Sequence, residues 1–139
     1  MRVLFLDFDG VLHPVTDDPS DDQYFMWLPH LVDALAEYAD VSVVVHSTWR
    51  YLFDDRELRA LLGALGNRFV GAAPRGPRYE AITWWLHLNE KFDSYRILDD
   101  APGEFPEPAP EQLIVCHSQR GVSDPVVLAQ LRSWLGPER

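Results

Sequence analysis

Two carboxylates one residue apart, Asp7 and Asp9, follow the apolar run of residues 2–6 and precede Gly10. Alternate side chains of a β-strand share a face, so the two acids project together where the strand ends and the glycine turns the chain. Two carboxylates about 4 Å apart repel by roughly 4 kcal/mol at an effective dielectric near 20. A divalent cation reverses this repulsion, so the pair predicts a hard metal ion at the mouth of a buried strand.

Two later apolar runs also end in polar side chains. The first leads into Ser47 and Thr48, and the second leads into Asp99 and Asp100. In open α/β sheets, ligands bind beyond the carboxyl ends of the strands, near the point where the strand order reverses. We therefore expect these four residues to converge with the first acid pair.

The motif Asp7-Phe8-Asp9-Gly10-Val11-Leu12 resembles the first signature of the haloacid dehalogenase-like phosphatase superfamily. The hydroxyl residues after the second apolar run resemble its second signature, and the paired acids after the third run resemble its fourth. The resemblance spans roughly residues 2–135, and the matches occur in the family's order. The dipeptide Trp49-Arg50 after the hydroxyl residues resembles the sequence at this place in the compact, capless branch of the superfamily, which is linked to nucleic-acid repair proteins.

The third signature of the superfamily is a basic residue that precedes the last of these strands. Arg78 is the best candidate, and Arg75 and Lys91 are its rivals. The family usually has a lysine there, and an arginine offers a broad planar fork in place of a compact charge. The resemblance implies that this residue balances charge in the transition state of phosphoryl transfer.

The chemistry that the resemblance implies is hydrolysis of a phosphomonoester. Asp7 would attack phosphorus and form an aspartyl-phosphate that water then hydrolyses. Asp9 would act as a general acid and then as a general base, a role that fits a carboxylate whose pKa is raised by a crowded acidic site. The backbone carbonyl of Asp9 would bind the metal ion.

The implied cofactor is Mg²⁺, which prefers oxygen ligands and keeps several of its waters. Its implied ligands are Asp7, Asp9, Asp99 and Asp100. We expect Asp99 to be a direct ligand and Asp100 to bind directly or through water, because the side chains of these adjacent residues diverge if the strand geometry continues.

The implied substrate-binding residues surround the same strand ends. They are Gly10, Ser47, Thr48, Arg50 and Arg78. Ser47 would donate a hydrogen bond to a phosphate oxygen, and Thr48 is the alternative because the end of the strand is uncertain by a residue or two. Ser47 and Arg78 would join Asp7 and Asp9 as catalytic residues.

Length and charge narrow the class of protein. The chain has 139 residues, which is enough for one core but too few for a catalytic domain with a large accessory domain, so residues 1–139 are predicted to form one domain. With 22 acidic and 12 basic residues its net charge is −10, which argues against an extended nucleic-acid surface. The lone Cys116 and the lack of a long apolar stretch predict a soluble, cytoplasmic protein without membrane contact.

The order of the predicted elements is typical of a parallel sheet covered on both faces, because strands alternate with amphipathic helices. The expected strands are residues 2–7, 41–46, 68–70, 95–98 and 113–115. The expected helices carry apolar faces over residues 28–35, 58–65, 81–88 and 128–135. We predict a single three-layer α/β/α Rossmann-like domain with a mainly parallel sheet and no large cap.

Individual residues mark the ends and faces of these helices. Asp54 or Asp55 is expected to cap the second helix and Gly66 to stop it, while Ser123 caps the last helix and Gly136 and Pro137 end it. Helical spacing places Trp84, Trp85 and Leu88 on a core face and Trp134 in packing, whereas Trp49 lies beside the second signature.

Other reactive side chains lack the spacing of a site. Cys116 and His117 point oppositely on a strand, so packing explains them better than metal binding or nucleophilic catalysis. His30, His46 and His87 are interpreted as structural, and His13 is the histidine placed to touch a substrate.

Three functional hypotheses follow. The first is a Mg²⁺-dependent phosphomonoester hydrolase, the second a nucleic-acid end-processing phosphatase, and the third a non-catalytic phosphate-sensing module. Receiver domains place paired acids after the first strand and the phosphorylated aspartate after a middle strand, so the order here favours a hydrolase. The predicted site is open and accepts a phosphorylated small molecule or macromolecular end, with Val15–Phe25 as a local flap or a second copy of the chain as a cover.

Overall fold

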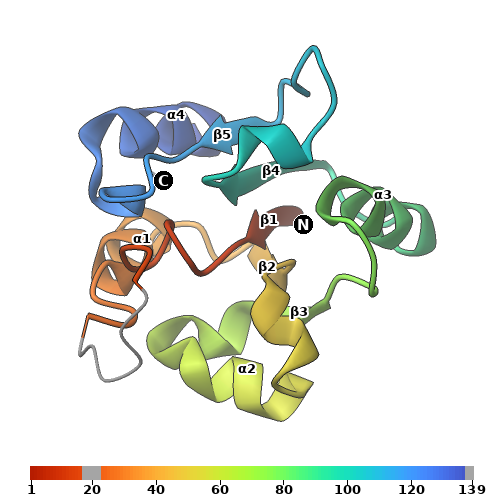
Figure 1. Ribbon diagram of the computed structural model, residues 1–139, viewed down its shortest axis with the longest axis horizontal. Coiled ribbons are helices and arrows are strands. Elements are labelled where there is room, and N and C mark those ends of the chain that lie inside the picture. The colour runs from red at the N-terminus through yellow and green to blue at the C-terminus, as the bar shows by residue number, and fades with distance from the viewer. Residues whose placement is uncertain (17–22, 137–139) are drawn as a thin grey trace.

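The computed structural model describes residues 1–16 and 23–136, and within them five strands form one parallel sheet (Figure 1). The strands are β1 (Arg2–Leu6), β2 (Val41–Val45), β3 (Phe69–Ala72), β4 (Ser94–Asp99) and β5 (Leu113–Val115). Their order across the sheet is β3-β2-β1-β4-β5, and each neighbouring pair is parallel. The mainly parallel sheet predicted from the sequence is therefore confirmed.

Helices cover both faces of the sheet, which gives the three predicted layers (Figure 1). The four α-helices are α1 (Leu28–Leu35), α2 (Asp55–Leu61), α3 (Arg78–Leu88) and α4 (Pro125–Leu135). Leu4 and Leu6 of β1 pack in the core shared with α1, α2 and α4, whereas Val3 and Phe5 pack in the core shared with α3. A strand buried on both faces must be apolar throughout, which explains the uninterrupted first run.

The central strand β1 lies at the point where the strand order reverses, because β2 follows it on one side and β4 lies on the other. Leu6 is level with Val45 of β2 and with Leu98 of β4. The segments that leave these three strands therefore start side by side at one edge of the sheet, where open α/β folds bind their ligands.

Two helix boundaries differ from the sequence-based prediction. Asp54 caps α2 and forms a capping box with Glu57, but the α-helix ends at Leu61 and a 3₁₀ helix, η2 (Gly63–Arg68), continues in place of the predicted last turn. The cap of α4 is Asp124, whose carboxylate accepts the Val126 N–H at 2.9 Å, and not Ser123. Ser123 is instead the last residue of the 3₁₀ helix η4 (Gly121–Ser123), and its hydroxyl donates to the carbonyl of Arg120.

The buried face of α3 is rotated from the predicted one. Trp84 and Leu88 are 55% and 61% exposed, whereas Ala81, Ile82 and Trp85 are buried. These three residues follow Arg78 at the spacing of one helix face, so the side of α3 that carries Arg78 faces the sheet. The prediction that Trp84 belongs to the core was wrong because a charged residue, Arg78, shares the inward stripe.

Gly121 permits a close contact between the loop after β1 and the segment before α4. It has a φ of +49°, and a Cβ there would lie 2.3 Å from the carbonyl oxygen of Val11 and 2.4 Å from the ring of Trp27. We expect Gly121→Ala to lower the free energy of unfolding by about 3 kcal/mol in urea denaturation. Gly103→Ala is the control, because nothing lies within 4 Å of its added Cβ, and equal stability of the two variants would contradict this reading.

The connections that could hold a cap are short in the described residues. Between β2 and β3 the chain forms only η1 (Thr48–Tyr51), α2 and η2. The predicted flap, residues 15–25, and the predicted stop at Pro137 lie partly or wholly outside the described ranges. None of the helices described is both long and apolar enough to cross a membrane.

Candidate active site

Three carboxylates converge beyond the carboxyl ends of β1 and β4. Asp7 follows β1, Asp99 is the last residue of β4, and Asp100 follows it; one oxygen from each lies within 4.8 Å of the others. The Asp7 N–H donates to the carbonyl of Leu98 at 3.2 Å, which holds the two segments together. Asp7 is 1% exposed and Asp99 is fully buried. Such an oxygen-rich cluster suits a hard divalent cation.

Asp100 turns back toward Asp7 because Gly10 leaves room for it. A Cβ on Gly10, whose φ is +75°, would lie 2.1 Å from Asp100 Oδ2. The strand geometry ends at Asp99, so the side chains of Asp99 and Asp100 do not diverge. The Gly10 N–H donates to the carbonyl of His13 at 2.8 Å. This bond occupies the Gly10 N–H, and the missing side chain of Gly10 admits Asp100.

Arg78 closes the acid cluster from the first turn of α3. Its Nη1 donates to Asp7 Oδ2 at 3.0 Å and to Asp99 Oδ1 at 2.8 Å. Although burial opposes it, the charges of Asp7 and Asp99 raise the pKa of the Arg78 guanidinium. Of the three basic candidates, Arg78 is the one that these contacts bring to the acids, and Arg75 instead lies over the ring of Tyr51, 4.9 Å from its centroid.

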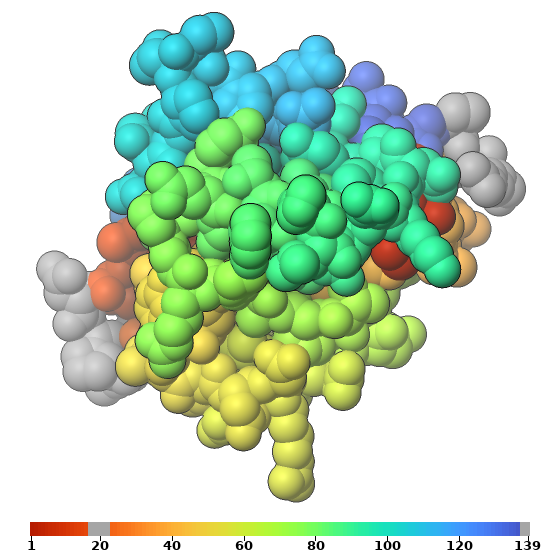
Figure 2. All heavy atoms as spheres, turned by 90° about the vertical axis from the view of Figure 1, so that its right-hand side faces the viewer, coloured from red at the N-terminus to blue at the C-terminus, as the bar shows by residue number. Residues whose placement is uncertain are grey.

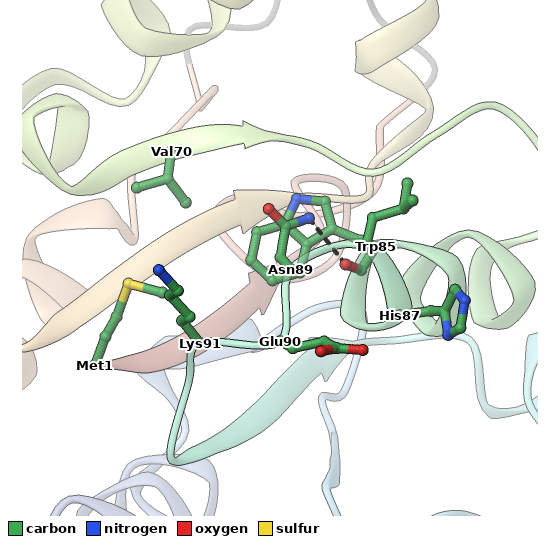
Figure 3. Close-up of a pocket in the computed structure, with 8 residues that line it drawn as sticks. Met1, Val70, Trp85, His87, Asn89, Glu90 and Lys91 are labelled. Atoms are coloured by element: carbon green, nitrogen blue, oxygen red, sulfur yellow. Dashed lines mark hydrogen bonds between the residues drawn. The ribbon is translucent and has the colours of Figure 1, made fainter.

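Lys91, the other rival, lies at the opposite edge of the sheet. It lines a hollow of about 620 Å³ at the end of α3 (Figure 3). The lining residues are Met1, Val70, Trp85, His87, Leu88, Asn89, Glu90 and Lys91. Because Met1 precedes β1 and Lys91 precedes β4, this hollow adjoins the amino ends of the strands and is separate from the acid cluster.

His46 is a contact of the acid cluster that the sequence analysis missed. It is fully buried, and its Nε2 lies 2.7 Å from Asp99 Oδ2. Burial lowers the pKa of His46 despite the raising effect of Asp99, so the ring is neutral and donates from Nε2. Among the described residues, His46 Nδ1 is buried without a hydrogen-bond partner. Its position directly before Ser47, at the end of β2, was the available signal.

Asp9 points away from the other three acids. Its Oδ1 lies 2.8 Å from His13 Nε2, and its Oδ2 accepts the indole N–H of Trp49 at 3.1 Å. The Phe25 N–H donates to His13 Nδ1 at 3.2 Å, so Nε2 is the ring nitrogen that donates to Asp9. His13 is buried and contacts Asp9 in place of the predicted substrate.

The pKa of Asp9 is lowered, chiefly by the hydrogen bond with His13 and despite partial burial. The predicted increase was therefore wrong, because the acids crowd around Asp7 and not around Asp9. Burial raises the pKa of Asp7 well above its ordinary value, and the charge of Asp99 adds to this effect. Burial also raises the pKa of Asp100. Although burial alone would raise it, the hydrogen bond from His46 and the charge of Arg78 hold the pKa of Asp99 below its ordinary value.

The hydroxyl residues after β2 separate in the structure. Ser47 is fully buried and caps η1, where its Oγ accepts the Trp49 N–H at 3.2 Å and its own hydrogen stays available for donation. Thr48 is exposed. Ser47 directly follows His46, the residue that contacts Asp99, so it is the hydroxyl adjacent to that contact.

Arg50 holds two loops together. Its guanidinium donates to the carbonyls of His46 and Ser47 on one side and of Pro74 and Gly76 on the other. All three of its nitrogens thus have protein acceptors. The structure gives Arg50 a positioning contact where the sequence analysis had placed a substrate ligand.

The parallel sheet with its acidic cluster at the switch point is the arrangement of a haloacid dehalogenase-like (HAD) hydrolase domain. A family model described as "HAD domain in Swiss Army Knife RNA repair proteins" matches residues 3–127, and the chain belongs to this family. The membership supports a hydrolase of the phosphatase type. Searches among curated proteins and among solved structures gave no match.

Proposed function

We propose that this protein is a Mg²⁺-dependent phosphomonoester hydrolase that works through an aspartyl-phosphate on Asp7. The observation that carries the proposal is the convergence of Asp7, Asp99 and Asp100 with the guanidinium of Arg78. Three acids at this spacing disfavour one another unless a cation joins them. Burial raises the pKa of Asp7 and of Asp100, and the charge of Asp99 adds to this effect. Family membership supports the same class of reaction.

The residues present fit a hard metal ion. Asp7, Asp99 and Asp100 would hold it, together with the backbone carbonyl of Asp9. When bound, Mg²⁺ neutralises charge on the phosphate oxygens and so lets one carboxylate approach phosphorus. Arg78 places a second positive charge beside the same oxygens.

The reaction has two displacements. In the first, an Asp7 oxygen bonds to phosphorus, the bond to the leaving oxygen breaks, and that oxygen takes a proton from Asp9. In the second, water bonds to phosphorus, its proton goes to Asp9, and the bond to Asp7 breaks. The lowered pKa of Asp9 suits a base and weakens it as an acid. Ser47 donates to a phosphate oxygen.

The direct test is hydrolysis of an aryl phosphate with Mg²⁺ and with EDTA. An aryl oxide leaves without a proton, so the test does not depend on the acid function of Asp9. We expect turnover that EDTA removes and added Mg²⁺ restores. Equal turnover with EDTA would contradict the metal dependence, and lack of turnover despite Mg²⁺ binding would favour the phosphate-sensing module.

Stabilisation by Mg²⁺ is expected to depend on pH. Burial raises the pKa of Asp7 in the folded state above its value in the unfolded chain, which is about 4. The stability that protonated Asp7 contributes is therefore complete below about pH 4 and is lost as the pH rises through the folded-state pKa. Mg²⁺ replaces this proton, so it should raise Tm more at about pH 7.5 than at about pH 5.5. Thermal melts with and without Mg²⁺ measure this difference, and an equal shift at both pH values would contradict it.

A nucleic-acid end-processing phosphatase is the second candidate. The family description names RNA repair proteins, which favours a phosphorylated strand end as the substrate. The net charge of −10 opposes a long electrostatic contact, so only the terminal nucleotides would be bound. Comparing a phosphate-terminated oligonucleotide with an aryl phosphate separates the two candidates.

A further inference from the structure

Three arginines lie around the carboxyl edge of the sheet, and they differ in what they already bind. Arg78 is paired with Asp7 and Asp99, and Arg50 is bonded to backbone carbonyls. Arg75 is exposed, and in the part of the chain that the structure describes it has no hydrogen bond and no ion pair. Its five N–H donors are free for a ligand.

The ring of Tyr51 fixes the position of Arg75. The Arg75 guanidinium lies 4.9 Å from the ring centroid, and that of Arg50 lies 4.5 Å from it. The Tyr51 hydroxyl accepts the Gly76 N–H at 3.0 Å and donates to the Gly76 carbonyl at 3.1 Å. A guanidinium stacked on a fixed ring loses less rotamer freedom when it binds a ligand. Figure 2 shows this loop, in green, against η1, in yellow.

Neither cation on the Tyr51 ring has a carboxylate partner within residues 1–16 and 23–136. Arg50 donates to carbonyl and hydroxyl oxygens, so its charge is hydrogen-bonded but not neutralised. In a chain with a net charge of −10, two such unpaired positive charges side by side attract an anion.

The site of this attraction adjoins the acid cluster through Arg50, which donates to the carbonyl of His46, the residue that contacts Asp99. Arg75 precedes Arg78 by three residues, which span at most about 11 Å of chain. A hollow of about 300 Å³ opens beside it, lined by Pro74, Arg75, Gly76, Glu80, Ala81 and Trp84. The Glu80 carboxylate repels anions, which places an anionic ligand on the Tyr51 side of Arg75.

We propose that Arg75, stacked on Tyr51, binds a second phosphate group of the substrate. The substrate class is then a phosphomonoester whose leaving group carries another phosphate. This inference rests on the proposed hydrolase function, because Arg78 and the acid cluster must bind the phosphate that is cleaved. Charge-assisted hydrogen bonds to one such group raise affinity by about tenfold or more.

The test compares kcat/KM for a nucleoside bisphosphate with that for the matching nucleoside monophosphates, in Mg²⁺. We expect the native chain to prefer the bisphosphate by about tenfold or more and Arg75→Gln to lose that preference through KM. Arg132→Gln is the control, because it removes an exposed arginine from the far end of α4, and it should keep the native ratio. A native ratio near one would overturn the inference, and so would an equal loss on both substrates in Arg75→Gln.

An aryl phosphate and a dinucleotide with a terminal phosphate complete the design. Turnover of the aryl phosphate without a bisphosphate preference refutes the Arg75 site alone. If nothing is hydrolysed, the hydrolase proposal fails. Calorimetry then measures the affinity for the bisphosphate and tests the Arg75 site separately. Weaker binding by Arg75→Gln than by Arg132→Gln supports the site, and equal binding refutes it. If the dinucleotide is preferred over the bisphosphate, the second phosphate group belongs to a nucleic-acid strand end. If the bisphosphate is preferred, it belongs to a small molecule.

Discussion

Asp7→Asn is expected to reduce Mg²⁺-dependent phosphatase turnover by at least about 10³-fold, because an amide cannot serve as the nucleophile. The same change should raise Tm in the absence of Mg²⁺. Burial and the charge of Asp99 both disfavour the ionised form of Asp7, so a neutral side chain of equal shape relieves the repulsion. Mg²⁺ should also raise Tm less in this variant. Steady-state kinetics and thermal melts measure the two effects.

The control is Asp33→Asn, which makes the same chemical change at an exposed position on α1. It should leave both turnover and the Mg²⁺ effect at native values. Retention of more than about a tenth of native turnover in Asp7→Asn would remove Asp7 from the role of nucleophile. The combination of lost turnover with unchanged or higher Tm distinguishes a chemical defect from misfolding.

Gly10→Ala is expected to lower turnover by at least about 100-fold through the metal site. The added Cβ would lie 2.1 Å from Asp100 Oδ2 and 2.9 Å from Asp100 Cβ, so Asp100 must leave the cluster. The φ of +75° also strains an alanine by about 1–2 kcal/mol. Removal of one of three carboxylates weakens Mg²⁺ binding, which calorimetry measures directly.

Gly63→Ala is the matched control, because it combines a φ of +54° with only an ordinary contact for the added Cβ, 3.7 Å from Leu28. It carries a backbone strain without a clash at the acids. If Gly10→Ala bound Mg²⁺ as tightly as Gly63→Ala, the close packing of Gly10 against Asp100 would not be what shapes the metal site.

The sheet was predictable because burial on both faces demands uninterrupted apolar runs, such as residues 3–6. The orientation of α3 was not, since Trp84 and Leu88 fit a helical apolar stripe as well as the true one does. What selects the true stripe is the contact of Arg78 with Asp7 and Asp99, a tertiary interaction that hydrophobic spacing does not record. The predicted end of α2 was wrong for a related reason. Leu65 is buried as expected, but it lies in the 3₁₀ helix η2, and hydrophobic spacing does not distinguish the two kinds of helix there.

In the candidate site, too, positions in the chain were predictable, but contacts between distant residues were not. The acids that end strands were predictable from position, and the structure brings Asp7, Asp99 and Asp100 together. The direction of Asp9 was not, because it depends on His13 and Trp49, which lie 4 and 40 residues away in the chain. The expected increase in the Asp9 pKa assumed crowding by other acids, whereas two N–H donors hold this carboxylate outside the cluster.

The most direct test of the central claim is the stereochemical course of hydrolysis at phosphorus. The substrate is a phosphate monoester made chiral at phosphorus by isotopic labelling, and the configuration of the released phosphate is determined. Attack by Asp7 followed by attack of water inverts phosphorus twice, so we predict net retention. Net inversion would mean that water displaces the leaving group in one step, and it would contradict an aspartyl-phosphate on Asp7.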